Sequence, residues 1–247
     1  MRQPQRHTGF SLTEVLLAVA TLAVGMLFVG GTFVLGIFYS ARATEQTIAA
    51  VVVEEAVTKI RLYGFAPEPN SIGYTLYGPH QAGMDPDEFL YPSGRGMGRS
   101  ERQYSWSALC KRQGADPNSR MVQVTVFVSR SAGIGDRPVP TSLQIKGIAG
   151  DTRDEIQFSN AASVDLLYEG SVLVDDITGQ IYRVLEIGPS GSDRVVRLDR
   201  PWQGTSATAV WAVPRPPSPT ASTRNPCIAV YQTEMRMPRG PEIRPNP

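Results

Sequence analysis

One acidic residue, Glu14, lies just inside a long apolar stretch of the chain. No charged residue follows it from Val15 to Ala41. A carboxylate at the edge of a hydrocarbon layer costs a few kcal/mol, so an ionisable residue in such a place is a candidate functional site. Glu14 is therefore the first residue whose function needs an explanation.

Two groups of carboxylates elsewhere in the chain could also do chemistry. In the stretch MDPDEF, Asp85, Asp87 and Glu88 offer the oxygen ligands that calcium prefers, but they fall well short of a full ligand set. A solvated acidic turn is the favoured interpretation, with calcium as a weak candidate. Asp175 and Asp176 form a pair before a Thr-Gly sequence, where aspartates more often form a turn than a catalytic site.

The cysteines and histidines exclude several kinds of site. Cys110 and Cys227 are the two cysteines and form no CxxC pair, which argues against a zinc cluster or a thioredoxin-like redox site. His80 is the one histidine beyond the first nine residues, so neither a histidine-based triad nor a multi-histidine metal site can be built. We therefore predict no catalytic residue, no metal and no cofactor, and a protein that is not an enzyme.

The composition bounds the class of protein. The 247 residues suffice for one or two domains. Lysine plus arginine number 24 and aspartate plus glutamate 23, and this balance gives no electrostatic reason to expect a nucleic-acid partner. The 23 glycines and 20 prolines favour turn-rich β structure over a helical bundle.

The first forty residues predict a single-pass membrane protein. Residues 10–39 are long enough to cross a bilayer as a helix and too long for the apolar part of a cleaved secretory signal. Arg2 and Arg6 precede the span without an acidic neighbour, so we expect the N-terminus to stay in the cytoplasm. Everything after Tyr39 then lies outside the inner membrane, in the periplasm of a Gram-negative cell.

The helix is predicted to continue beyond the membrane. No proline or glycine interrupts residues 40–62, and Gly64 follows. Glu55 and Lys59 stand four apart in the favoured order. Apolar residues recur with the spacing of an amphipathic helix, at Ala49, Val52, Val53, Ala56 and Ile60. We expect one helix of about fifty residues, roughly 75–80 Å long, whose second half (residues 40–64) packs on a soluble domain.

The stretch GFSLTEVLLAVATLAVGML resembles the N-terminal signature of type IV pilins and type II secretion pseudopilins. The resemblance covers roughly the first 30 residues and is highly specific. It implies that prepilin peptidase removes a leader, residues 1–9, by cutting after Gly9. Phe10 then becomes the N-methylated first residue, and Glu14 is the fifth residue of the mature chain.

The resemblance also implies a role for Glu14. In a helical filament of such subunits, the carboxylate neutralises the N-terminal amine of a neighbouring subunit. In a low dielectric the pair attracts strongly but offsets its desolvation only with good geometry, so it favours one stagger between subunits. Other pilin or pseudopilin subunits and the inner membrane are the implied partners, besides the peptidase.

Glycines within the span leave two interpretations open. Small residues allow close contact between helices in a membrane, whereas the resemblance suggests local melting of the helix during assembly. Each glycine weakens a helix interior by up to about 1 kcal/mol. The four are Gly25, Gly30, Gly31 and Gly36.

The clearest strands flank residues 113–119. In residues 104–110 and 121–130, apolar and polar side chains alternate with period two, which predicts a hairpin. An antiparallel sheet with one apolar face is what an amphipathic helix needs to pack against. We therefore predict an α+β fold: a long N-terminal helix laid on an antiparallel sheet, the arrangement of pilins.

Short, closely spaced strands after this hairpin predict an additional small β-barrel-like module. We expect it to be an inserted module, at residues 163–213, that the remaining globular domain (65–162) does not need for folding and that a partner binds. Trp202 is expected to cap the barrel. The rest comprises a proline-rich linker (214–226), a final strand (227–237) and a disordered tail (238–247).

The two cysteines also leave two interpretations open. Both lie on the oxidising side of the membrane in the predicted topology. A disulfide between Cys110 and Cys227 would tie the final strand to the hairpin and gain about 4–5 kcal/mol in the chain-entropy model. Alternatively both are buried free thiols, because Cys110 shares the apolar face of its strand with Trp106.

Together these features predict a minor pilin-like (pseudopilin) subunit of a type II secretion or type IV pilus-like filament. The alternative is a membrane-tethered periplasmic module, rich in β structure, that binds a glycan or a protein and forms no filament. A membrane-anchored enzyme is disfavoured because no nucleophile–base pair is found. Gly9 followed by Glu14 distinguishes the filament subunit from the tether, which needs neither residue.

Overall fold

The computed structural model describes residues 11–64, 73–78, 84–93, 98, 102–114, 119–130, 137–149, 152–188, 195–204, 208–215 and 225–237. The chain forms two compact units, residues 1–47 and residues 48–247. The boundary falls within the first helix. The fold class is α+β, with one long N-terminal helix and antiparallel sheets, of which one is a closed barrel.

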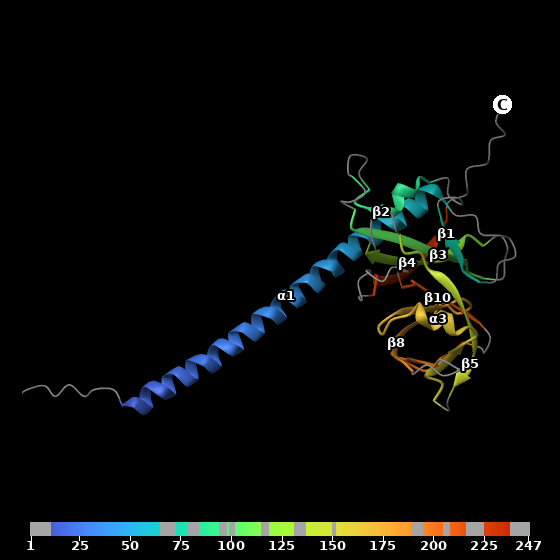
Figure 1. Cartoon of the computed structure of the whole chain (residues 1–247). Coiled ribbons are helices and arrows are strands. Elements are labelled where there is room, and N and C mark those ends of the chain that lie inside the picture. Colours follow the sequence, from blue (N-terminus) through green and yellow to red (C-terminus); the bar gives the residue numbers. More distant parts are fainter. Residues whose placement is uncertain are drawn as a thin grey trace, which may run out of the picture. The chain divides into compact units, whose positions relative to one another are not determined.

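Helix α1 spans Leu12–Tyr63, 52 residues, without interruption (Figure 1). Its length agrees with the prediction of about fifty residues. Gly64 ends the helix because its φ of 77° lies in the left-handed region, outside the right-handed helical conformation of the preceding residues. Its amide donates a last helical hydrogen bond to the carbonyl of Ile60, at 2.9 Å.

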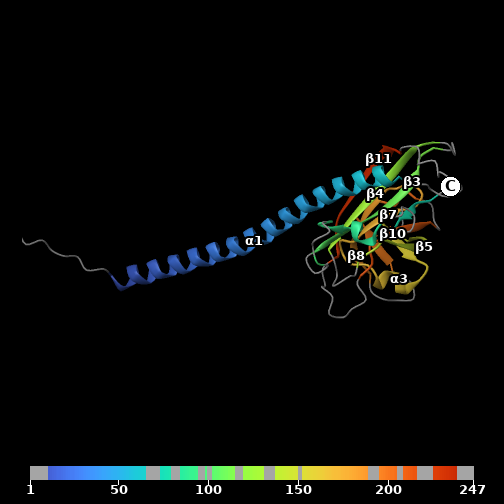
Figure 2. The same ribbon diagram turned by 90° about the horizontal axis from the view of Figure 1, so that it is seen from above.

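The second unit begins with the last part of α1, which lies on an antiparallel sheet (Figure 2). The residues that touch the sheet are fully buried. They are Ala49, Val52, Ala56 and Ile60. All four were predicted from their spacing, and the fifth predicted residue, Val53, is partly buried against the same core.

The sheet has the strand order β1-β3-β4-β11, and β2 pairs with β3 beside β1. All of its pairs are antiparallel, and β3 and β4 form the predicted hairpin, with Tyr104 opposite Arg130. The predicted final strand is β11. The strands are β1 (Thr75–Tyr77), β2 (Leu90–Tyr91), β3 (Tyr104–Arg112), β4 (Met121–Arg130) and β11 (Cys227–Arg236).

Period-two alternation gives this sheet two buried faces rather than one. The face toward α1 carries Trp106, Ala108 and Cys110 of β3, as the alternation predicted. The opposite face carries Leu109 of β3 and Phe127 of β4, both fully buried. A sheet with two buried faces needs a second covering layer.

The second layer is a closed barrel with the strand order β10-β5-β6-β9-β8-β7, in which β10 also pairs with β7 (Figure 1). Its interior is filled by side chains, and the rings of Tyr182 and Trp202 lie 4.7 Å apart within that core. The elements are β5 (Thr141–Ala149), β6 (Glu155–Phe158), α3 (Ala161–Asp165), β7 (Val172–Asp175), β8 (Ile181–Ile187), β9 (Val195–Leu198) and β10 (Ala209–Ala212).

The barrel begins earlier than the predicted module at 163–213. Strand β5 pairs with β10 on one side and with β6 on the other, so the barrel cannot close without residues 141–158. A register shift between Ile145 and Gly147 explains why the sequence pattern does not reveal that the barrel starts at β5. An irregularity of this kind breaks the period-two alternation from which a strand is read. Residues 141–162 therefore belong to the barrel and not to the globular domain assigned to 65–162.

The insertion itself is visible in the topology. Strands β4 and β11 are neighbours in the sheet, and the barrel lies between them in the sequence. The barrel does not stand apart from the sheet, however. Val174 of β7 and Val213 after β10 pack against Leu109 and Phe127 in one buried cluster, and the barrel thereby supplies the second layer.

Candidate functional site

The first unit of the chain carries the candidate site around Glu14. Glu14 lies in the first turn of α1 and its amide donates to the carbonyl of Ser11, at 3.0 Å. A carboxylate is favoured there because the helix dipole is positive at its N-terminal end. The Glu14 side chain has no ion-pair partner among residues 11–64 or the other described ranges. Gly9 and Phe10, the predicted processing residues, lie outside the described residues.

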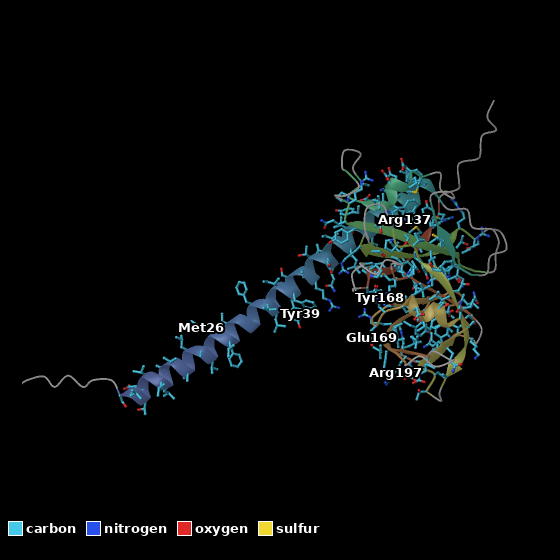
Figure 3. All side chains as sticks on the ribbon, in the orientation of Figure 1. Met26, Tyr39, Arg137, Tyr168, Glu169 and Arg197 are labelled. Carbon is cyan, nitrogen blue, oxygen red and sulfur yellow. The ribbon has the colours of Figure 1, made fainter. Side chains whose placement is uncertain are left out.

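The surface that follows Glu14 is apolar on every side. Leu27, Phe28 and Phe33 are 77%, 72% and 71% exposed, and the side chains of Met26 and Tyr39 project away from the helix (Figure 3). A helix that is hydrophobic all round requires lipid or other helices around it. Within the described residues, α1 is the one helix long and apolar enough to span a membrane.

Polar groups within the span are satisfied by the helix itself. The Thr21 hydroxyl donates to the carbonyl of Leu17 or Ala18, at 3.0 and 2.9 Å, and the Thr32 hydroxyl donates to Val29, at 2.9 Å. Hydroxyls bonded in this way need no water. Glu14 carries the one charged side chain of α1 ahead of Arg42.

The glycines of the span do not interrupt the helix. α1 continues through Gly25, Gly30, Gly31 and Gly36, and a side chain at any of these positions would meet no atom of the first unit. The absence of steric demand within the described first unit fits both interpretations of these glycines.

The acidic turn at residues 85–88 is engaged inside the fold. Asp85 accepts from the amide of Asp87, at 2.9 Å, and thereby caps the short 3-10 helix η1 (Pro86–Phe89). Asp87 pairs with the buried Arg102 across 3.1 Å. The described residues contain no cluster of three potential metal ligands. The turn therefore stabilises the fold through contacts within the chain, whereas the sequence had indicated a turn that is merely solvated.

Glu88, the third calcium candidate, is bound by a lysine. The Lys59 ammonium lies 2.7 Å from Glu55, 2.7 Å from the Glu88 carboxylate and 2.8 Å from the Glu88 carbonyl. The predicted Glu55–Lys59 pair is therefore confirmed and extended by a partner distant in sequence. The Lys59 ammonium thus pairs with Glu88 and fastens α1 to η1.

Asp175 and Asp176 have different roles. Asp175 is fully buried and accepts from the amides of Ile177 and Thr178, at 3.3 and 3.1 Å, as a turn-former does. Asp176 instead accepts from the amide of Tyr74, at 2.8 Å, and from the indole of Trp211, at 2.7 Å. It joins the barrel to the sheet, a role that no local pattern predicted.

The cysteines form no disulfide, and both are free thiols. Cys110 faces α1, whereas Cys227 lies in the cluster on the opposite face. Cys110 is level with Val124 of β4 and Cys227 with Ser129. With strands about 4.8 Å apart and a rise of about 3.4 Å per residue, the two lie roughly 20 Å apart, and a disulfide needs about 7 Å or less. Of the two interpretations left open by the sequence, the structure therefore agrees with two separate free thiols.

Burial controls the chemistry of these thiols. Desolvation raises the pKa of Cys110 well above its ordinary value, and it raises the pKa of Cys227 to about 12. A buried neutral thiol is a poor nucleophile and a poor metal ligand.

Trp202, expected as a cap on the barrel, is buried in the barrel core.

Comparison of the chain with protein-family models, with curated proteins and with solved structures finds no match. Only features of the chain itself therefore bear on its function. Its distinguishing features are an exposed apolar helix with one acid at its start and a globular unit that covers both faces of a sheet.

Proposed function

We propose that this chain is a minor pilin-like, or pseudopilin, subunit that assembles through its N-terminal helix into a type II secretion or type IV pilus-like filament. One observation carries the proposal. Residues 12–47 of α1 are exposed almost throughout, and Glu14 is their sole charged residue before Arg42. Such a surface calls for lipid before assembly and for helices of other subunits after it.

Each processing residue has a stated role in this proposal. Prepilin peptidase cuts after Gly9, and the new N-terminal amine on Phe10 is methylated. The Glu14 carboxylate of one subunit then pairs with the amine of a neighbour. Because an unpaired buried charge is far more costly than a paired one, only one stagger of the helices is favoured. Before assembly, the subunit spans the inner membrane once, with everything after Tyr39 on the periplasmic side.

The size of the globular unit suggests a low-copy position. The barrel adds residues 141–213 to the sheet and helix, and this added bulk crowds a close-packed helical array. A subunit near the filament tip meets less crowding than one along the shaft. Retention of Glu14 argues against the extreme tip, since a tip subunit in this family tends to lack that acid.

The N-terminus of the mature protein tests the proposal. The full chain is produced in a host with an active prepilin peptidase, extracted from membranes and analysed by intact mass. The expected chain lacks residues 1–9 and carries one added methyl group. A Gly9→Val variant is expected to stay uncut. A wild-type chain that still begins at Met1 would contradict the filament role.

A second candidate, a membrane-tethered binding module, is favoured by the barrel. The barrel has a core of its own, and its filled interior leaves the outer surface for recognition. Crosslinking in membranes separates the two candidates. A filament subunit crosslinks through cysteines placed in residues 12–47 to other prepilin-type subunits, whereas a tether crosslinks to none of them.

A further inference from the structure

Strand β11 forms one edge of the sheet (Figure 2). β4 pairs with it along one side, and among the described strands none pairs with its other side. The opposite edge of the sheet is formed by β1 and β2, which have three and two residues, whereas β11 has ten. A short edge offers little backbone to another chain, but a long one is a template for a further strand.

The register shows which backbone groups of β11 face the open side. Just beyond the pair of Arg236 with β4, the amide of Met237 donates to the carbonyl of Arg120, at 2.9 Å. Because hydrogen bonding alternates along an antiparallel strand, every second residue back from Met237 also bonds to β4. The residues between them direct their backbone groups away from β4, and within the described ranges these groups have no backbone partner. They are Val230, Gln232, Glu234 and Arg236.

This edge lacks the features that usually protect a long strand. Proline, charged side chains and bulges are common protections. β11 contains no proline, its one register shift lies at its start, between Cys227 and Ala229, and its charged residues are confined to its end. Tyr231, in the middle of the strand, is 38% exposed. Residues 229–236 are therefore a regular strand whose open side is available for pairing.

Segments of the same chain are poor occupants of this edge. Residues 214–226 and 238–247, which flank β11 in the sequence, are rich in proline. Proline has no N–H to donate and is disfavoured in a paired strand. The occupant is therefore expected to come from another chain.

A second copy of β11 also fits poorly. In the antiparallel registers that overlap nearly the whole strand, Glu234 lies opposite Val230 or Ile228 of the second copy. The register that places Glu234 opposite Arg236 of the second copy overlaps only residues 233–237. Cross-strand pairs of opposite charge stabilise a sheet, so two copies of this strand cannot combine a long overlap with matched charges.

We propose that the open edge of β11 binds an extended segment of a different protein, which adds to the sheet as a strand. The segment runs antiparallel to β11, as all other pairs of this sheet do. It contains no proline, and it carries a basic residue opposite Glu234 and an acidic residue opposite Arg236. An apolar side chain opposite Tyr231 covers that exposed ring. This inference does not depend on the proposed filament, because a membrane-tethered binding module would use the same edge.

Hydrogen exchange of the free chain tests whether the edge is open. It is measured residue by residue on the full chain in detergent. The outward amides of Gln232 and Glu234 are expected to exchange about tenfold or more faster than the Thr233 amide between them, which is bonded to β4. Protection of the outward amides at every protein concentration would mean that the chain itself covers the edge. Protection that rises with protein concentration would mean that a second copy does, and either result overturns the proposal.

A synthetic peptide tests the chemistry of the partner. The peptide Glu-Thr-Lys-Thr-Thr-Phe-Val places its acid opposite Arg236, its lysine opposite Glu234 and its phenylalanine opposite Tyr231. At up to about 1 mM, where binding with a millimolar Kd is detected, it is expected to slow exchange of the outward amides by about twofold or more. The control peptide Lys-Thr-Glu-Thr-Thr-Phe-Val places like charges opposite each other and is expected to bind about threefold or more weakly. No protection by the first peptide, or equal protection by both, overturns the proposal.

Two variants at one position separate backbone pairing from side-chain contact. Glu234→Pro removes an outward N–H that the fold does not use. Glu234→Gln keeps that N–H and an oxygen that can accept from the side chain of Gln113, and loses only the charge. The first peptide is expected to protect the Gln232 amide in Glu234→Gln, with reduced affinity, and not in Glu234→Pro. Equal protection in both variants would mean that the peptide does not pair with the backbone of β11, contrary to the proposal.

Discussion

Glu14 and Lys59 are both charged residues of α1, and they differ in what surrounds them. Lys59 is mostly buried and contacts two carboxylates and a carbonyl of its own chain. Glu14 is exposed, next to an apolar surface, with no ion-pair partner among the described residues. A charge satisfied within the chain indicates a structural role. Glu14 has no such partner among the described residues, and the proposed filament assigns it a partner in another subunit.

Glu14→Val is expected to leave membrane insertion and leader cleavage intact and to impair assembly, because the proposed partner of the carboxylate is another subunit. Crosslinking between prepilin-type subunits, through cysteines placed in residues 12–47, is expected to fall. Glu54→Val, which removes an exposed acid from the same helix, serves as the control. Equal crosslinking in wild type and Glu14→Val would mean that the carboxylate has no role in assembly.

The thiols of Cys110 and Cys227 are expected to be unreactive in the folded chain. Burial raises the pKa of each, and only the thiolate attacks a maleimide. At pH 8, labelling of the native chain is expected to be slower than labelling of the urea-unfolded chain by about tenfold or more. Gel mobility is expected to be the same with and without reductant. Rapid labelling of the native chain, or a gel band that shifts on reduction, would contradict the assignment of both cysteines as unreactive free thiols.

The same thiols give a dependence of stability on pH. Their folded-state pKa values lie above the ordinary thiol value of 9.0, so only the unfolded chain releases their protons near that pH. The stabilisation is complete below pH 9 and is lost as the pH rises from 9 toward 12. A Cys110→Ala/Cys227→Ala chain is expected to lose less stability over that interval, as measured by urea unfolding.

At the scale of elements, α1 is one helix with two different surfaces. Residues 12–47 expose apolar side chains in every direction, while the remainder buries one stripe against the sheet. The helix is continuous because no proline interrupts it. Its change of surface follows from the change of side-chain pattern at the boundary between the two units.

Val52→Ala is expected to lower the free energy of unfolding of the second unit by about 1–3 kcal/mol, because it removes two buried methyl groups and leaves a cavity against the sheet. Its neighbour provides a matched control. Val51 is 46% exposed, and Val51→Ala is expected to change the same quantity by less than about 0.5 kcal/mol. Urea unfolding of the full chain in detergent measures both. Equal effects would mean that this stripe is not the packed one.

At the scale of the second unit, the barrel is an insertion that has become a structural layer. It has its own core, yet Leu109 and Phe127 of the sheet pack against Val174 and Val213 of the barrel. The expectation that the sheet folds without the barrel conflicts with this contact, since removal of the barrel would expose both side chains to water.

Asp176→Ala is expected to loosen the barrel from the sheet without unfolding it. The change leaves the amide of Tyr74 and the indole of Trp211 without their acceptor, at a cost of about 1–3 kcal/mol. Hydrogen exchange at residues 73–77 is expected to accelerate, while exchange in the barrel core stays slow. Glu169→Ala, on an exposed loop of the barrel, is the control. Unchanged exchange at residues 73–77 would show that Asp176 does not hold the two layers together.

The sequence by itself determined the features that depend on local periodicity or composition. The helix, its buried stripe at Val52 and Ala56, and the hairpin of β3 and β4 were predictable, because spacings of 3.6 and 2 residues are properties of one continuous segment. Glu14 was identified in the same way, as a charge at the start of an uncharged span.

Only the tertiary structure decided the features that join residues distant in sequence. Three features each pair two segments that carry no local sign of each other: the start of the barrel at Thr141, the hydrogen bond from the Tyr74 amide to Asp176, and the contact of Lys59 with Glu88. The separation of the cysteines was decided in the same way. A free thiol and a bridged one share the same local sequence, and the register of three strands settles which of them can form.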